Sequence, residues 1–146
     1  MMNKIFDYLL LIFLILVMLL ASSCVIEDEL YIPSLPTLEL DGRLEIDSNG
    51  YYHLELNQNT TQTIHTISGT VGNTVDLPPM KVEWDSNLTW IYQGEEVPTT
   101  NQASYVIDGM VSNVIAPINT MIGDTLIVNG TIRDYLITDT IKIVLE

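Results

Sequence analysis

Two histidines, His53 and His65, are the side chains of this chain that could accept a proton near neutral pH. A histidine that works as a catalytic base needs a partner that orients it. Neither a Gly-x-Ser-x-Gly elbow nor a His-Glu-x-x-His pair accompanies these two in the sequence. The sequence therefore predicts structural or surface roles for both histidines and no enzymatic activity. A small enzyme, or a zinc site built from both histidines and a carboxylate, is the alternative.

Acidic side chains dominate the charged residues, with 19 Asp and Glu against 5 Lys and Arg and a formal net charge of −14. Such a chain repels phosphates, so DNA and RNA are excluded as partners. Carboxylates in this number could supply the oxygen ligands of a calcium ion, which takes about six to eight of them. The candidate calcium ligands are four aspartates near the ends of expected strands: Asp85, Asp108, Asp124 and Asp134. Since the sequence has no Asp-x-Asp-x-Asp-Gly loop, turn formation and solvation are the alternative roles of these residues.

The single cysteine, Cys24, follows a segment with the features of an export leader. Lys4 gives a positively charged start, and residues 9–21 form an unbroken apolar run. About 13 residues of helix cover ~20 Å, which is short of the ~30 Å hydrocarbon core and typical of a signal sequence. Small residues lead directly into Cys24, and this pattern resembles the lipobox of bacterial lipoproteins, with Ala21 in place of the usual leucine. The resemblance implies removal of residues 1–23 and a lipid on Cys24 that holds the protein to a membrane; an ordinary secretory leader and a retained transmembrane segment are the alternatives.

Residues 24–36 are expected to form a tether between the lipidated cysteine and a folded domain. Pro33 and Pro36 favour extended backbone in this segment. The acidic cluster EDE at 27–29 lies just behind Cys24 and resembles the surface-export signal of Bacteroidota lipoproteins. The resemblance implies an outer-membrane lipoprotein displayed on the cell surface. The alternative is a solvated acidic linker on a protein that faces the periplasm.

From residue 37 onward, apolar residues alternate with polar ones, which is the pattern of strands that bury one face. This alternation predicts strands at 44–46, 52–56, 64–71, 80–84, 103–108, 126–132 and 141–145. The SNG sequence at 48–50 predicts a turn that joins the first two strands into a hairpin. About seven short strands in residues 37–146 predict a single all-β domain, an antiparallel β-sandwich.

A repeated pattern links two of these strands, ISGTV at 67–71 and VNGTI at 128–132. Glycine inside a strand lets a bulky side chain approach the backbone closely. We therefore expect Trp84 to be a core residue that packs against Gly69 and Gly130.

A set of short motifs resembles the bacterial Ig-like domains of the polycystic-kidney-disease (PKD) type. They are ISGTV at 67–71, VEWDSN at 82–87, GDTL at 123–126, GTIRD at 130–134 and DTIKI at 139–143. The resemblance covers residues 40–146 and implies an Ig-like sandwich that serves as a spacer, an adhesive module or a binding appendage of the envelope. The usual glycine-rich turn between the last two strands is replaced here by YLIT at 135–138.

Trp90 and Tyr92 alternate on the segment that follows Trp84 and form the candidate binding platform. Exposed aromatic side chains stack against sugar rings or seat a protein partner. The alternative is an edge strand that shares its aromatics with the core. We interpret the chain as a lipid-anchored envelope protein whose domain binds an envelope protein or a glycan, or acts as a spacer. A subunit docked permanently in an envelope assembly is the other reading of the same features.

Overall fold

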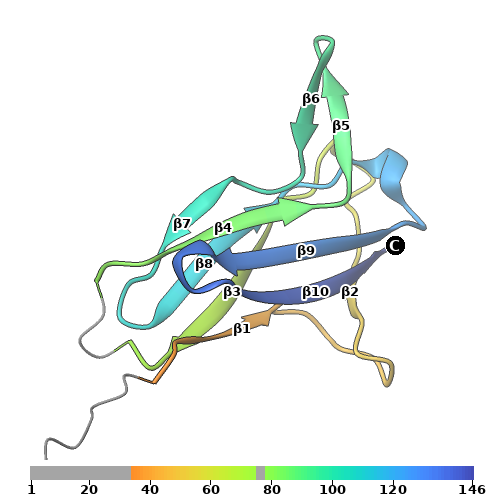
Figure 1. Cartoon of the computed structure of the whole chain (residues 1–146). Helices are drawn as coiled ribbons and strands as arrows, with labels where there is room; N and C mark the ends of the chain where they lie inside the picture. The colour runs from red at the N-terminus through yellow and green to blue at the C-terminus, as the bar shows by residue number, and fades with distance from the viewer. Residues whose placement is uncertain (1–33, 75–77) are drawn as a thin grey trace, which may run out of the picture. The chain divides into compact units, whose positions relative to one another are not determined.

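Ten strands and two short 3-10 helices make up the part of the chain that the computed structural model describes, residues 34–74 and 78–146 (Figure 1). The predicted leader at 1–23, Cys24 and the tether up to residue 33 lie outside the described residues. The strands are β1 (Thr37–Asp41), β2 (Tyr52–Leu54), β3 (His65–Gly72), β4 (Lys81–Ser86), β5 (Thr89–Tyr92), β6 (Glu95–Pro98), β7 (Ala103–Tyr105), β8 (Met110–Ile115), β9 (Thr125–Ile132) and β10 (Ile137–Leu145). The helices are η1 (Asn119–Met121) and η2 (Arg133–Tyr135).

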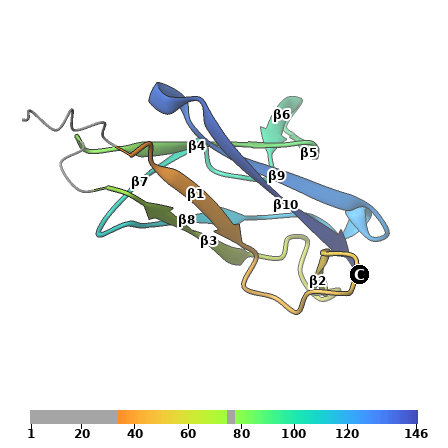
Figure 2. The same cartoon turned by 60° about the horizontal axis from the view of Figure 1, so that its bottom comes forward.

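Two sheets lie face to face in this part of the chain (Figure 2). The three-stranded sheet has the order β1-β3-β8, and the five-stranded sheet has the order β2-β10-β9-β4-β7. Every pairing in these sheets is antiparallel except that between β10 and β2, which is parallel. β5 and β6 pair only with each other as a separate hairpin. The predicted all-β, sandwich-like architecture is confirmed.

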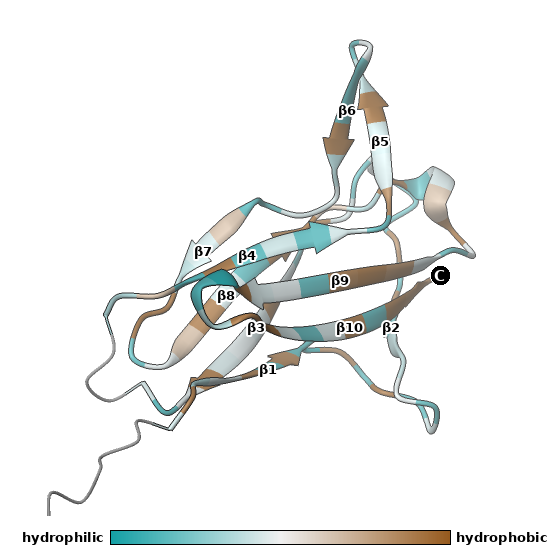
Figure 3. Cartoon of the chain, viewed as in Figure 1, coloured by the Kyte–Doolittle hydropathy of each residue, from teal (hydrophilic) through white to brown (hydrophobic). Residues whose placement is uncertain are grey.

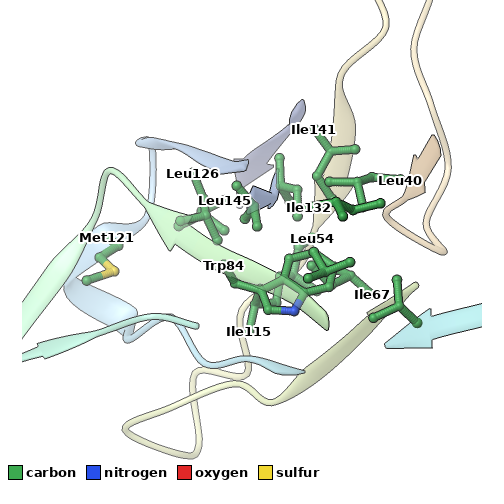
Figure 4. Packing of buried hydrophobic residues seen from close by; sticks show 14 of the residues in the cluster. Leu40, Leu54, Ile67, Trp84, Ile115, Met121, Leu126, Ile132, Ile141 and Leu145 are labelled. Atoms are coloured by element: carbon green, nitrogen blue, oxygen red, sulfur yellow. The ribbon is translucent and has the colours of Figure 1, made fainter. Parts of the chain in front are cut away.

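Side chains from both sheets meet in one hydrophobic core (Figure 4). β9 illustrates the period-two pattern, because every second residue from Leu126 to Ile132 is buried and the residues between them are partly exposed. Ile67 and Ile115 face this strand from the three-stranded sheet and are completely buried. Each such side chain contributes about 1.5–3 kcal/mol through burial. The core therefore joins the two sheets into one folding unit, which spans Ser34–Glu146.

Trp84 is a core residue, as predicted, with only 7% of its surface exposed. Its indole Nε1 donates a hydrogen bond to Ser104 Oγ at 3.1 Å, which satisfies the one polar atom of the side chain. Trp84 pairs with Gly130 across the β4–β9 ladder, as expected of a neighbour, but the atoms nearest to a Cβ on either glycine belong to other residues. A Cβ atom on Gly69 would lie 2.9 Å from the side chain of Leu40, and one on Gly130 would lie 3.2 Å from it. Both glycines therefore make room for Leu40 of β1, which inserts between the sheets.

The segment at 44–56 forms the predicted hairpin only next to its turn. Its turn is present, since the Asp47 carboxylate accepts the N–H groups of Asn49 and Tyr51. Only an isolated bridge joins Ile46 to Tyr52, however. The chain crosses here from one sheet to the other, and β2 pairs with β10 in parallel. A local turn signal does not reveal this crossover, because the parallel partner is distant in the sequence.

β1, β6 and β8 were not anticipated, which is one reason why the described residues contain more than the seven or so strands expected. In β8 the inward-facing residues are Val111, Asn113 and Ile115. Asn113 interrupts the apolar alternation and is buried with its Nδ2 donating to the carbonyl of Asn101. A polar residue at a core position hides a strand from a pattern based on hydrophobicity.

The connections gather at two ends of the sandwich. At one end, Asn73 Nδ2 donates to the carbonyl of Leu35, just before β1, and the turn at 107–110 lies beside β3. At the other end, the loop at 55–64 contacts the segment at 116–119, and the β5–β6 hairpin leaves the sandwich (Figure 1). A side-chain link also joins the sheets, because the N–H of Leu40 in β1 donates to Asp139 Oδ2 of β10 at 2.7 Å.

Candidate functional site

The β5–β6 hairpin projects from the sandwich and carries both aromatic residues of the predicted platform (Figure 1). In its ladder Trp90 pairs with Val97 and Tyr92 with Glu95. Gln93 and Gly94 close the hairpin with φ angles of 53° and 86°. Two successive residues with positive φ match the type I′ turn, whose twist fits that of the flanking strands. The projection is therefore a regular hairpin with two defined faces.

The base of the hairpin is fixed to the sandwich. Thr99, which follows β6, is buried, and its Oγ1 lies 2.8 Å from Ser86 Oγ at the end of β4 and 3.1 Å from the carbonyl of Leu88. The carbonyl of Thr99 accepts the N–H of Ala116 at 2.7 Å. These contacts tie the two ends of the hairpin to each other and to the segment after β8, so the hairpin leaves the sandwich in a fixed direction.

Trp90 braces the hairpin against the domain. Its side chain is partly buried and packs against the hydrophobic core. Its ring meets the ring of Tyr92 edge to face, with centroids 5.6 Å apart and planes inclined by 61°. Such pairs contribute about 0.5–1.5 kcal/mol beyond the area that they bury. Trp90 Nε1 is buried without a hydrogen-bond partner among the described residues, whereas Tyr92 is 56% exposed.

The opposite face of the hairpin presents Ile91 to solvent, with 67% of its surface exposed. Ile91 pairs with Glu96, whose Oε1 accepts a hydrogen bond from Thr89 Oγ1 at 2.6 Å. Figure 3 shows apolar segments on both hairpin strands. Ile91 and the two glutamates of β6 were not predicted from the sequence. The signal that could have found them is the QG pair at 93–94 between two short alternating segments, which predicts a two-residue hairpin.

The four candidate calcium ligands lie on separate elements. Asp85 lies in β4, Asp108 in the turn at 107–110, Asp124 just before β9 and Asp134 in η2. Across residues 34–74 and 78–146, no group of three or more His, Cys, Asp or Glu side chains is arranged to hold a metal ion. The structure therefore does not bring these aspartates together.

His53 lies between two carboxylates, and His65 contacts a backbone carbonyl. His53 Nδ1 lies 2.7 Å from Glu146 Oε1, and its Nε2 lies 3.5 Å from Asp47 Oδ2. The hydrogen bond with Glu146 raises the pKa of His53 above its usual value, partial desolvation opposes this, and Asp47 adds to the rise. His65 Nε2 lies 2.7 Å from the carbonyl of Gly42. The two histidines lie in different environments and do not converge on a common site.

Basic side chains are few in the described part of the chain, and none lies on the hairpin. Lys81 and Arg133 both pair with Glu83, and the hydrogen bond from Lys81 is the main cause that lowers the pKa of Glu83. Arg43 donates through Nε to Ser68 Oγ. No ion pair among the described residues includes a carboxylate of the hairpin.

Cys24, the predicted lipidation site, and the acidic cluster at 27–29 lie outside the described residues. In the described ranges, no helix is long and apolar enough to cross a membrane. The projecting hairpin is therefore the candidate functional site that the geometry supports best. No family model matches this chain, and no curated protein matches it either.

Proposed function

We propose that this chain is a lipid-anchored protein of the bacterial cell envelope whose Ig-like domain binds a partner without catalysis. The β5–β6 hairpin is the binding element in this proposal. The lipid on Cys24 would hold the domain to the outer membrane, with the acidic cluster at 27–29 directing it to the cell surface.

The Ig-like part of the proposal draws its support from the strand order. In constant-type Ig sandwiches the first, second, fourth and fifth strands share one sheet, and the third, sixth and seventh share the other. Counting without β2 and the hairpin strands, β1, β3 and β8 match the first, second and fifth strands and β4, β9 and β10 the third, sixth and seventh, whereas β7, the fourth, lies in the second sheet. β2 extends the second sheet beside β10, and β7 extends it beside β4. The hairpin is then an insertion after the third strand.

One observation carries the binding role: the hairpin projects at the end of the sandwich opposite Leu35 and β1 (Figure 1). A tether that joins the domain before β1 would leave the hairpin at the far end, where a partner could reach it. A spacer needs no such projection. An isolated hairpin is marginally stable in water, so the fixed base and the brace by Trp90 favour a role that requires this shape.

The test removes the hairpin and keeps the sandwich. Residues 89–98 are excised and Leu88 is joined to Thr99 through two glycines, since the two residues already lie within hydrogen-bond distance of each other. We expect the wild-type chain, gently solubilised from its own membranes, to migrate in a complex larger than itself on a native gel. The shortened chain should migrate at its own mass while keeping its β-rich circular dichroism. A complex that persists without the hairpin would contradict the proposal.

A second variant tests the lipid. Cys24→Ala should abolish labelling by a fatty-acid probe and release the protein from membranes, because the substitution removes the site that carries the acyl chains. Two or three such chains anchor a protein stably, since each buried methylene contributes about 0.8 kcal/mol. Cys24→Ala leaves the hairpin intact, so it separates loss of the membrane from loss of the partner. Equal lipid labelling of both chains would rule out Cys24 as the lipidation site.

A further inference from the structure

We infer that the β5–β6 hairpin inserts Ile91 and Tyr92 into an apolar depression of a protein partner whose rim carries lysine or arginine side chains. This inference rests on the proposed binding function and adds the chemistry of the partner. It is carried by three properties of the hairpin: its exposed apolar side chains, its rigidity and its charge.

The exposed apolar side chains lie on both faces of the hairpin near its turn. Ile91 is 67% exposed and Tyr92 is 56% exposed, although they point to opposite faces. A partner that contacts both must enclose the tip of the hairpin, so a depression fits and a flat surface does not. Binding energy at protein interfaces concentrates in a few such apolar and aromatic side chains that fill pockets.

Rigidity makes this presentation effective. The fixed base at Thr99, the brace by Trp90 and the two-residue turn hold the tip in one arrangement before any partner arrives. A preformed element loses little conformational entropy on binding, which raises affinity without new contacts.

Charge selects the partner. Glu95 and Glu96 lie side by side with the two apolar residues, and no basic side chain of the described part of the chain pairs with them. A second copy of this chain, with its net charge of −14, would be repelled, and so would an anionic membrane. A basic rim around the depression would instead pair with both glutamates and speed association.

The test places a photo-reactive amino acid, p-benzoylphenylalanine, at position 91 of the full chain in its own membranes. The matched control carries it at Ile107, which is as exposed as Ile91, at 69% against 67%, but lies at the opposite end of the sandwich. We expect a discrete protein adduct at 91 and none at 107. Glu95→Lys together with Glu96→Lys should lower the adduct yield about tenfold or more. Glu39→Lys together with Glu55→Lys, two exposed positions that change the net charge equally, should leave it unchanged.

Each other outcome overturns the inference. An adduct at twice the chain's own mass would identify a second copy, and one that glycosidases remove would identify a glycan. An adduct that survives charge reversal on the hairpin would show that a basic rim is not involved. An adduct at 107 and not at 91 would retain a binding function and reject the hairpin as its site, whereas no adduct at either position would reject both proposals.

Discussion

Replacing Trp84 by alanine should remove the largest side chain of the core. Trp84 is 7% exposed, lies among Leu54, Ile67 and Ile115 (Figure 4) and donates its only polar hydrogen to Ser104. Truncation of a buried tryptophan costs about 3–5 kcal/mol, because apolar burial is lost and a cavity is left. A domain of this size has about 5–15 kcal/mol in total, so the variant should retain only part of its stability.

Thermal melting followed by far-UV circular dichroism measures this loss. For a domain of about 110 residues, 1 kcal/mol corresponds to roughly 4 °C, so we expect the melting temperature to fall by about 12–20 °C. Trp84→Phe keeps most of the ring and should lose less than half as much. Ile91→Ala is the surface control and should melt within about 2 °C of the wild type. A Trp84→Ala protein that melts within about 3 °C of the wild type would refute the placement of the core.

Three further predictions follow from other contacts. Trp90→Ala should lower the free energy of unfolding by less than Trp84→Ala does, because the side chain is only partly buried, and denaturant titration measures the difference. Gly130→Ala should cost about 1–3 kcal/mol, since its Cβ would lie 3.1–3.2 Å from Val82 and Leu40, and Leu40→Ala should therefore cost less in the Gly130→Ala chain than in the wild type. The raised pKa of His53 contributes stability that is complete below pH 6.5 and is lost as the pH rises through the folded-state pKa, so urea midpoints should fall between pH 6 and 8 in the wild type and less in His53→Asn.

The sequence predicted the strands whose inward residues are uniformly apolar. In β9 and in the 141–145 part of β10 the alternation is unbroken, and the structure buries the expected side, whereas Asp139 interrupts it in the first half of β10. β8 was not predicted because Asn113 occupies a core position, and its hydrogen bond to Asn101 forms only in the folded chain. Period-two patterns report which residues are buried and carry no information on a polar residue whose partner is remote.

Packing partners across the core were harder to predict than the strands themselves. The glycines at 69 and 130 correctly indicated a close approach, but the side chain that approaches is Leu40 of the first strand. Likewise, the alternation of Trp90 and Tyr92 predicted a strand but not the direction in which it leaves the sandwich. The separation of the hairpin from both sheets depends on the contacts of Thr99, which no local sequence pattern reveals. The sequence therefore predicted the residues of the platform but not their arrangement in space. The binding role of the platform stays a prediction.

The arrangement of β1 has a mechanical consequence. β1 runs alongside β3 from Thr37, paired with Gly72, to Asp41, paired with Ser68, and the hairpin lies at the opposite end of the sandwich from Thr37. A pull on the chain at Thr37 in the direction of β1 would act along the strand axis. Hydrogen bonds between strands lie across this axis, so they would be loaded in shear and all together instead of opening one after another. The link from Leu40 to Asp139 would share that load, and the domain would resist extension at the point where force enters it.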